Sequence, residues 1–116
     1  MITGMPDYAI LMRENDDAWS RLAPAEQQAL MQRYEAWTAD LKARGIFQGG
    51  LPLGAGGRVL SNVDGTIVEA PFAETRQVLT GYIVIAAPDW DAAVAIARGC
   101  PALTHGETVE LRPVGL

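Results

Sequence analysis

The fold is decided by the stretch RVLSNVDGTIVE, which spans residues 58–69. It contains two runs rich in apolar and β-branched residues, joined by the step Asp64-Gly65. An Asp-Gly step between such runs is a strong signal for a β-hairpin, because both central positions of the two-residue loop need a positive φ. Pro71 ends the second run, since proline cannot continue a strand ladder. The stretch therefore predicts a hairpin.

Helices and strands alternate on both sides of this hairpin. Before it, we predict a buried strand at residues 8–13, a helix starting at Pro24 and a strand around Phe47. The helix carries one apolar stripe at spacings of four, three and four residues: Leu30, Tyr34, Trp37 and Leu41. After the hairpin, residues 72–80 are expected to form a polar connection to a strand at 81–87.

The last third of the chain predicts a helix and a closing strand. Asp89 is a suitable helix cap, and Pro101 prevents the helix from continuing. The inward face of this helix is expected to contain Trp90, Val94 and Ala97. In the final strand, residues 108–114, Arg112 points to the face opposite its apolar neighbours.

This order of elements predicts an α+β class: a ferredoxin-like βαββαβ fold with an extra hairpin. We expect one domain over residues 8–116, after a flexible leader at 1–7. Both helices would cover the same face of the sheet. The other face, lined by apolar side chains, is too apolar to remain in water. A partner sheet is therefore expected, which makes the protein a homodimer.

Composition excludes several classes of function. The chain has 116 residues, a net charge of −5, one histidine and one cysteine. An acidic chain lacks the basic surface that nucleic acids require, so no nucleic-acid partner is expected. His105 and Cys100 cannot supply a closed metal site, and we predict no metal and no cofactor. No secretory signal or long apolar run is present, so we expect a cytoplasmic protein without membrane contact.

Two parts of the sequence carry a family resemblance. They are PFAET at residues 71–75, after VDG at 63–65, and VELRP at 109–113, after CPALTHG at 100–106. Over residues 8–114 the chain resembles the DGPF-domain branch of the YCII-related family. Glu69-Ala70 stands where the branch has its Asp-Gly, which keeps a carboxylate but loses the glycine.

The resemblance implies a fold and a setting. Sheet-to-sheet dimerisation into a dimeric α+β barrel is expected, with a cleft in which wider relatives place a histidine and an aspartate. Members of the branch are often encoded beside sigma factors of the extracytoplasmic-function class, which implies a stress or regulatory setting. The family as a whole has no single reaction to carry over.

His105 is the first candidate catalytic residue, because histidine exchanges protons near neutral pH. The alternative is a hydrogen-bonded loop histidine without a catalytic role. Glu74 is the second catalytic candidate, although a plain ion pair with Arg76 or Arg112 would also explain it. Candidate substrate-binding groups are two arginines for an anionic group, a hydroxyl and a carboxylate: Arg112, Arg76, Tyr82 and Glu69.

Two functional hypotheses follow. The first is a cofactor-free enzyme in which His105 and a carboxylate transfer a proton on a small polar or aromatic substrate. The second is a non-catalytic dimeric module that binds a small ligand or a regulatory partner in a sigma-factor or stress response. We expect the cleft to include residues 71–76, His105 and the last strand.

Overall fold

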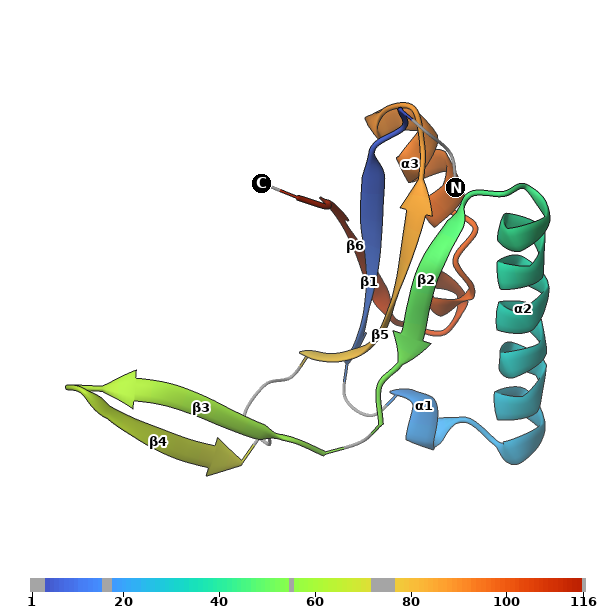
Figure 1. The fold of residues 1–116 in the computed structure, drawn as a ribbon. Helices are drawn as coiled ribbons and strands as arrows, with labels where there is room; N and C mark the ends of the chain where they lie inside the picture. Colours follow the sequence, from blue (N-terminus) through green and yellow to red (C-terminus); the bar gives the residue numbers. More distant parts are fainter. Residues whose placement is uncertain (1–3, 16–17, 55, 72–76, 116) are drawn as a thin grey trace.

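The computed structural model describes residues 4–15, 18–54, 56–71 and 77–115 (Figure 1). The elements follow in the order β1 (Asp7–Asn15), α1 (Ala18–Arg21), α2 (Pro24–Ala43), β2 (Phe47–Pro52), β3 (Arg58–Val63), β4 (Thr66–Pro71), β5 (Gln77–Ala86), α3 (Trp90–Ala97), the 3-10 helix η1 (Pro101–Thr104) and β6 (Thr108–Pro113). The predicted α+β class is confirmed. The expected connection at residues 72–80 is wrong for residues 77–80, because these residues already belong to β5.

The main sheet contains four strands in the order β2-β5-β1-β6, and every neighbouring pair is antiparallel. β1 occupies an inner position, where Ile10 pairs with Ile83 of β5 and with Leu111 of β6. This is the strand order of a ferredoxin-like sheet, as the sequence predicted. β1 begins at Asp7, and the Pro6 carbonyl accepts a hydrogen bond from the Ala87 amide, so the fold extends back into residues assigned to the leader.

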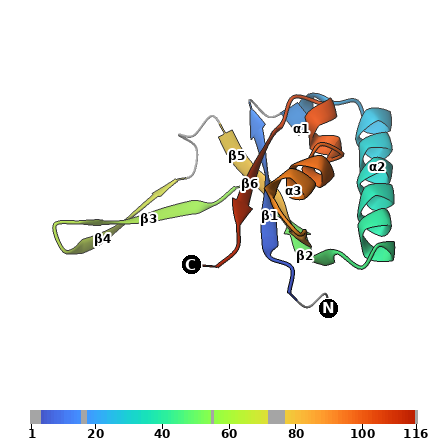
Figure 2. The same cartoon turned by 90° about the horizontal axis from the view of Figure 1, so that it is seen from above.

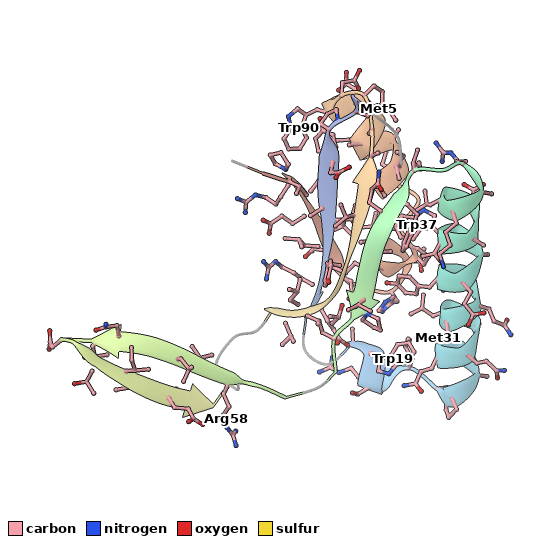
Figure 3. The ribbon with its side chains drawn as sticks, viewed as in Figure 1. Met5, Trp19, Met31, Trp37, Arg58 and Trp90 are labelled. Atoms are coloured by element: carbon pink, nitrogen blue, oxygen red, sulfur yellow. The ribbon has the colours of Figure 1, made fainter. Side chains whose placement is uncertain are left out.

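One face of the sheet is covered by helices. Alternate residues of β1 and β5 point to this face, and Ile10 and Ile85 are completely buried there. Leu41 of α2 and Ala102 of η1 cover them. Trp37 of α2 lies between the helix and the sheet (Figure 3). The opposite face carries Leu11, Tyr82, Val84 and their neighbours, and we call it the open face.

α2 confirms the predicted stripe and the poor cap. Leu30 and Leu41 are buried, and Ala23 provides no side-chain cap. The Glu26 carboxylate instead accepts a hydrogen bond from the Ala23 amide at 3.0 Å. A carboxylate at this end also interacts favourably with the helix dipole, which compensates for the missing cap.

α3 differs from the prediction in its inward face. Asp89 caps it as expected, accepting from the Ala92 amide at 2.9 Å. However, Trp90 and Val94 are exposed, and the buried residues are Ala93 and Ala97. Two alanines four residues apart let the helix backbone approach the sheet closely, which the bulkier pair would prevent. The Trp90 ring packs edge-on against the Tyr8 ring, with the two ring centroids 5.1 Å apart.

β3 and β4 form the predicted hairpin, which we call the arm (residues 58–71). Asp64 and Gly65 have φ values of 51° and 85°, as the two-residue loop requires. The arm extends from the sheet on the side away from α2 in both views (Figures 1 and 2). The radius of gyration is therefore 16.2 Å, whereas a compact chain of this length has about 13 Å.

Candidate functional site

The candidate site forms where η1 leads into β6. Pro101 ends the preceding helix and starts η1, and the chain then turns through Gly106. The Ala102 carbonyl accepts hydrogen bonds from the amides of both His105 and Glu107, at 3.4 and 3.3 Å. One backbone oxygen therefore holds both ends of the turn. This brings the two side chains together on the helix-covered side of the sheet.

His105 and Glu107 form a buried pair. Their side chains are 7% and 5% exposed, and His105 Nε2 lies 2.6 Å from Glu107 Oε2. The contact is short but poorly aligned with the ring, and within the described residues neither ring nitrogen has a hydrogen-bond partner of regular geometry. A buried imidazole nitrogen without a partner is costly. The histidine is therefore close to a carboxylate and keeps unused hydrogen-bonding capacity.

Glu107 connects this pair to two other elements. Its Oε1 accepts a hydrogen bond from the Thr80 hydroxyl of β5 at 2.6 Å, and its Oε2 accepts a longer one from the Tyr34 hydroxyl of α2 at 3.4 Å. Among the described residues it is the one buried charged side chain. Hydrogen bonds to a carboxylate compensate for part of its lost hydration. We call His105, Glu107, Thr80 and Tyr34 the polar cluster.

Two further groups beside Glu107 are held in their neutral forms. Burial, followed by the nearby Cys100 and Glu107, raises the pKa of Tyr34 above its ordinary range. Burial also raises the pKa of the Cys100 thiol to about 11, against opposing hydrogen bonds from Ala102 and Tyr34. At neutral pH neither group is ionised, so Cys100 is not a reactive thiolate. His105 and Glu107 are the members of this region suited to proton transfer.

A groove of about 680 Å³ adjoins the polar cluster. One side is formed by α2 and the turn before it, and the other by Thr104 and His105; the α2 side contains Leu22, Glu26, Ala29, Gln32, Arg33 and Ala36. Its size falls within the range of small-molecule sites. Glu26 and Arg33 give it one charge of each sign. A ligand in this groove would lie against His105.

The chain matches the family model of the YCII-related domain over residues 7–115. It belongs to the YCII-related family. This confirms the resemblance at the level of the family, and the DGPF branch stays a prediction. No curated protein matches this YCII-related chain. No helix in the described residues of this family member is both long and apolar enough to cross a membrane.

The other candidate residues of this YCII-related chain lie apart from His105. Glu69 is on the arm, where it forms an ion pair with Arg58 at 3.0 Å (Figure 3 labels Arg58). Tyr82 lies on the open face of the sheet, beside Leu11. Glu74 and Arg76 fall outside the described residues. Within one chain, the described candidates therefore do not form a single site with His105.

Arg112 is also on the open face, where it belongs to an ion-pair network. Glu110 contacts Arg112 and Arg13, each at 3.2 Å. The hydrogen bond from Arg112, followed by that from Arg13, lowers the pKa of the Glu110 carboxyl from its usual value. The guanidinium proposed from the sequence to bind substrate is therefore engaged in a salt bridge with Glu110.

Sequence reasoning missed the other three members of the polar cluster, of which Glu107 lies beside His105 and Thr80 and Tyr34 donate to Glu107. Thr80 was assigned to a connection, Tyr34 to the apolar stripe, and Glu107 was not considered. The available signal was a carboxylate two residues after the single histidine, across the turn at Gly106 and directly before β6. Among the described residues, no three His, Cys, Asp or Glu side chains lie close enough to hold a metal ion.

Proposed function

We propose that this protein is a cofactor-free enzyme in which His105 and Glu107 transfer a proton on a small molecule held in the groove beside α2. One observation carries the proposal: a buried imidazole lies 2.6 Å from a buried carboxylate and retains unpartnered ring nitrogens. General acid–base catalysis needs such a pair within hydrogen-bond reach of the substrate. Rotation of the imidazole toward the groove would present a ring nitrogen to a bound molecule, with the Glu107 carboxylate beside the ring.

The groove indicates the class of substrate. Arg33 offers a guanidinium that can hold a carboxylate with two hydrogen bonds, and Gln32 offers an amide. Leu22 and two alanines supply apolar surface. These groups suit a small polar or aromatic molecule that carries one anionic group. Glu74 and Arg76 are proposed as a second carboxylate and a second anion-binding group.

The second candidate function is a non-catalytic dimeric module that binds a ligand or regulatory partner. The burial of His105 and Glu107 favours it, because a catalytic pair must reach its substrate. Here Arg112 and Tyr82 would bind the ligand on the open face, with Glu69 contributed from the arm. A gene encoded beside that of a sigma factor, as is often the case in the DGPF branch, and a cytoplasmic location suit this candidate.

A ligand screen separates the two functions. We expect compounds of the stated class to raise the melting temperature of the wild-type protein, because binding stabilises by about 2.7 kcal/mol at one hundred times the Kd. His105→Ala should abolish this shift, and Arg112→Ala should retain it. Thermal-shift measurements on the three proteins test this expectation, with turnover of each hit followed by NMR. The reverse pattern, loss with Arg112→Ala alone, would assign ligand binding to the open face.

We also propose that the protein is a homodimer that covers the open face. Leu11, Tyr82 and Val84 form an apolar centre there, and the core packs only against the other side of the sheet. Static light scattering at 10–100 µM (roughly the range where a specific interface of standard size is occupied) should give the mass of two chains. A mass of one chain throughout would contradict the dimer.

A further inference from the structure

The arm is the least supported part of the fold. β3 and β4 pair with each other and form a sheet separate from the main one. Leu60 and Ile67 are 65% and 63% exposed, and each described apolar side chain of the two strands is exposed. An isolated two-stranded hairpin is at best marginally stable in water. Its apolar side chains therefore indicate a surface that another molecule covers.

The two faces of the arm differ in charge. Directly paired residues share a face, so the register assigns Val59, Ser61, Val63, Thr66, Val68 and Ala70 to one of them. This face has no charged residue, and we call it the charge-free face. The other face carries the Arg58–Glu69 ion pair beside Leu60 and Ile67. An ion pair across a face favours exposure to water, so the charge-free face is the one suited to burial.

A second uncovered apolar surface is present on the same chain. The open face of the sheet has Leu11, Tyr82 and Val84 at its centre. The arm projects on the side of the sheet away from α2, which is the side of the open face (Figures 1 and 2). The two surfaces together border the space that a second molecule would fill.

The dimensions of the arm and of the open face indicate which molecule covers them. A six-residue strand is about 20 Å long, and four strands span about 15–20 Å across, so the arm is as long as the sheet is wide. In projection the arm face covers on the order of 200 Å² and the open face about 500 Å². Neither alone approaches the roughly 800 Å² per partner of a standard interface, but the two together do.

We propose that the charge-free face of the arm packs against a second copy of this chain, and that the arm of the second copy packs against the first copy in the same way. A two-fold contact of this kind covers both apolar surfaces of both copies at once. An unrelated partner would have to match each surface separately. The inference rests on the proposed dimer and assigns to the arm a share of its interface.

Paired substitutions on the two faces test the proposal. Val68 and Ile67 are neighbours on β4 that point to opposite faces. Val68→Lys should raise the dimer dissociation constant at least about 100-fold, since it places a charge in an apolar contact. Ile67→Lys, the matched control, should change it less than about fivefold. Sedimentation over a concentration series gives both constants, and circular dichroism checks that both variants fold.

The outcomes separate the arm from the dimer itself. A monomeric wild type overturns both proposals. A dimeric wild type with an unaffected Val68→Lys variant overturns the arm alone, and dissociation by Ile67→Lys overturns the assignment of the face. Alkylation of Val68→Cys and Ile67→Cys is a second measurement without a disruptive charge, since Cys100 is buried. Val68→Cys should be protected at high protein concentration, while equal reactivity of the two would overturn the proposal.

Discussion

Gly50→Ala is expected to destabilise the fold by about 3 kcal/mol or more, which lowers the melting temperature by on the order of 10 °C. Gly50 lies in β2 with a φ of 155°, where a Cβ atom would meet the Tyr82 carbonyl oxygen and lie 2.9 Å from Ile83 Cα. Both are backbone atoms of the neighbouring strand, so no side chain can move aside. The variant must separate β2 from β5. Chemical denaturation of the two proteins measures the loss.

Gly49→Ala is the matched control. Gly49 has a similar φ of 144°, but no heavy atom lies within 4 Å of its added Cβ. It carries the cost of the backbone conformation without the collision, about 1–2 kcal/mol. We therefore expect Gly50→Ala to lose at least about twice as much stability as Gly49→Ala. Equal losses for the two variants would contradict the close approach of β2 and β5.

Glu107→Ala is expected to cost about 3 kcal/mol of stability. Removing the carboxylate takes away the acceptor that the Thr80 hydroxyl contacts at 2.6 Å and the acceptor that the Tyr34 hydroxyl contacts at 3.4 Å. It also leaves a cavity between three elements. Glu107→Gln keeps an oxygen acceptor and nearly the same volume, so it should lose less than half as much. Thermal and urea unfolding measure both.

Glu110→Ala provides the surface comparison. Glu110 also pairs with positively charged groups, but it lies on the edge strand β6, and its side chain is 39% exposed in the single chain. Ion pairs of this kind contribute little to stability, so the melting temperature should be nearly unchanged. If Glu107→Ala were as mild as Glu110→Ala, the polar cluster would not be a structural centre of the fold.

Local sequence signals predicted most of the fold. The Asp64-Gly65 step determines the arm because a two-residue loop depends on its own residues, and the stripe from Leu30 to Leu41 reflects helical spacing alone. The inward face of α3 could not be read in this way. Apolar character favoured Trp90, but the distance between helix and sheet selects the small Ala93 and Ala97. That distance is a property of the packed structure.

The candidate site was harder to predict than the fold. His105 stood out as the single histidine, but its carboxylate partner is Glu107, two residues away, rather than a distant acid. Glu107 resembles an ordinary polar residue at the start of a strand. Its burial depends on Tyr34, which is 73 positions away, and on Thr80. No local pattern contains that information. Glu74 remains a prediction, since it lies outside the described residues.

The strand order has a consequence for how the chain is synthesised and folds. β1 is made before the other strands, yet it pairs with β5 and β6, which emerge from the ribosome much later. Until then its apolar residues, Ile10 among them, have no sheet to join. Folding that depends on such distant pairings is slow compared with helical proteins of the same size. The nascent chain therefore exposes β1 until β5 and β6 have been made, and only then can the strand become buried.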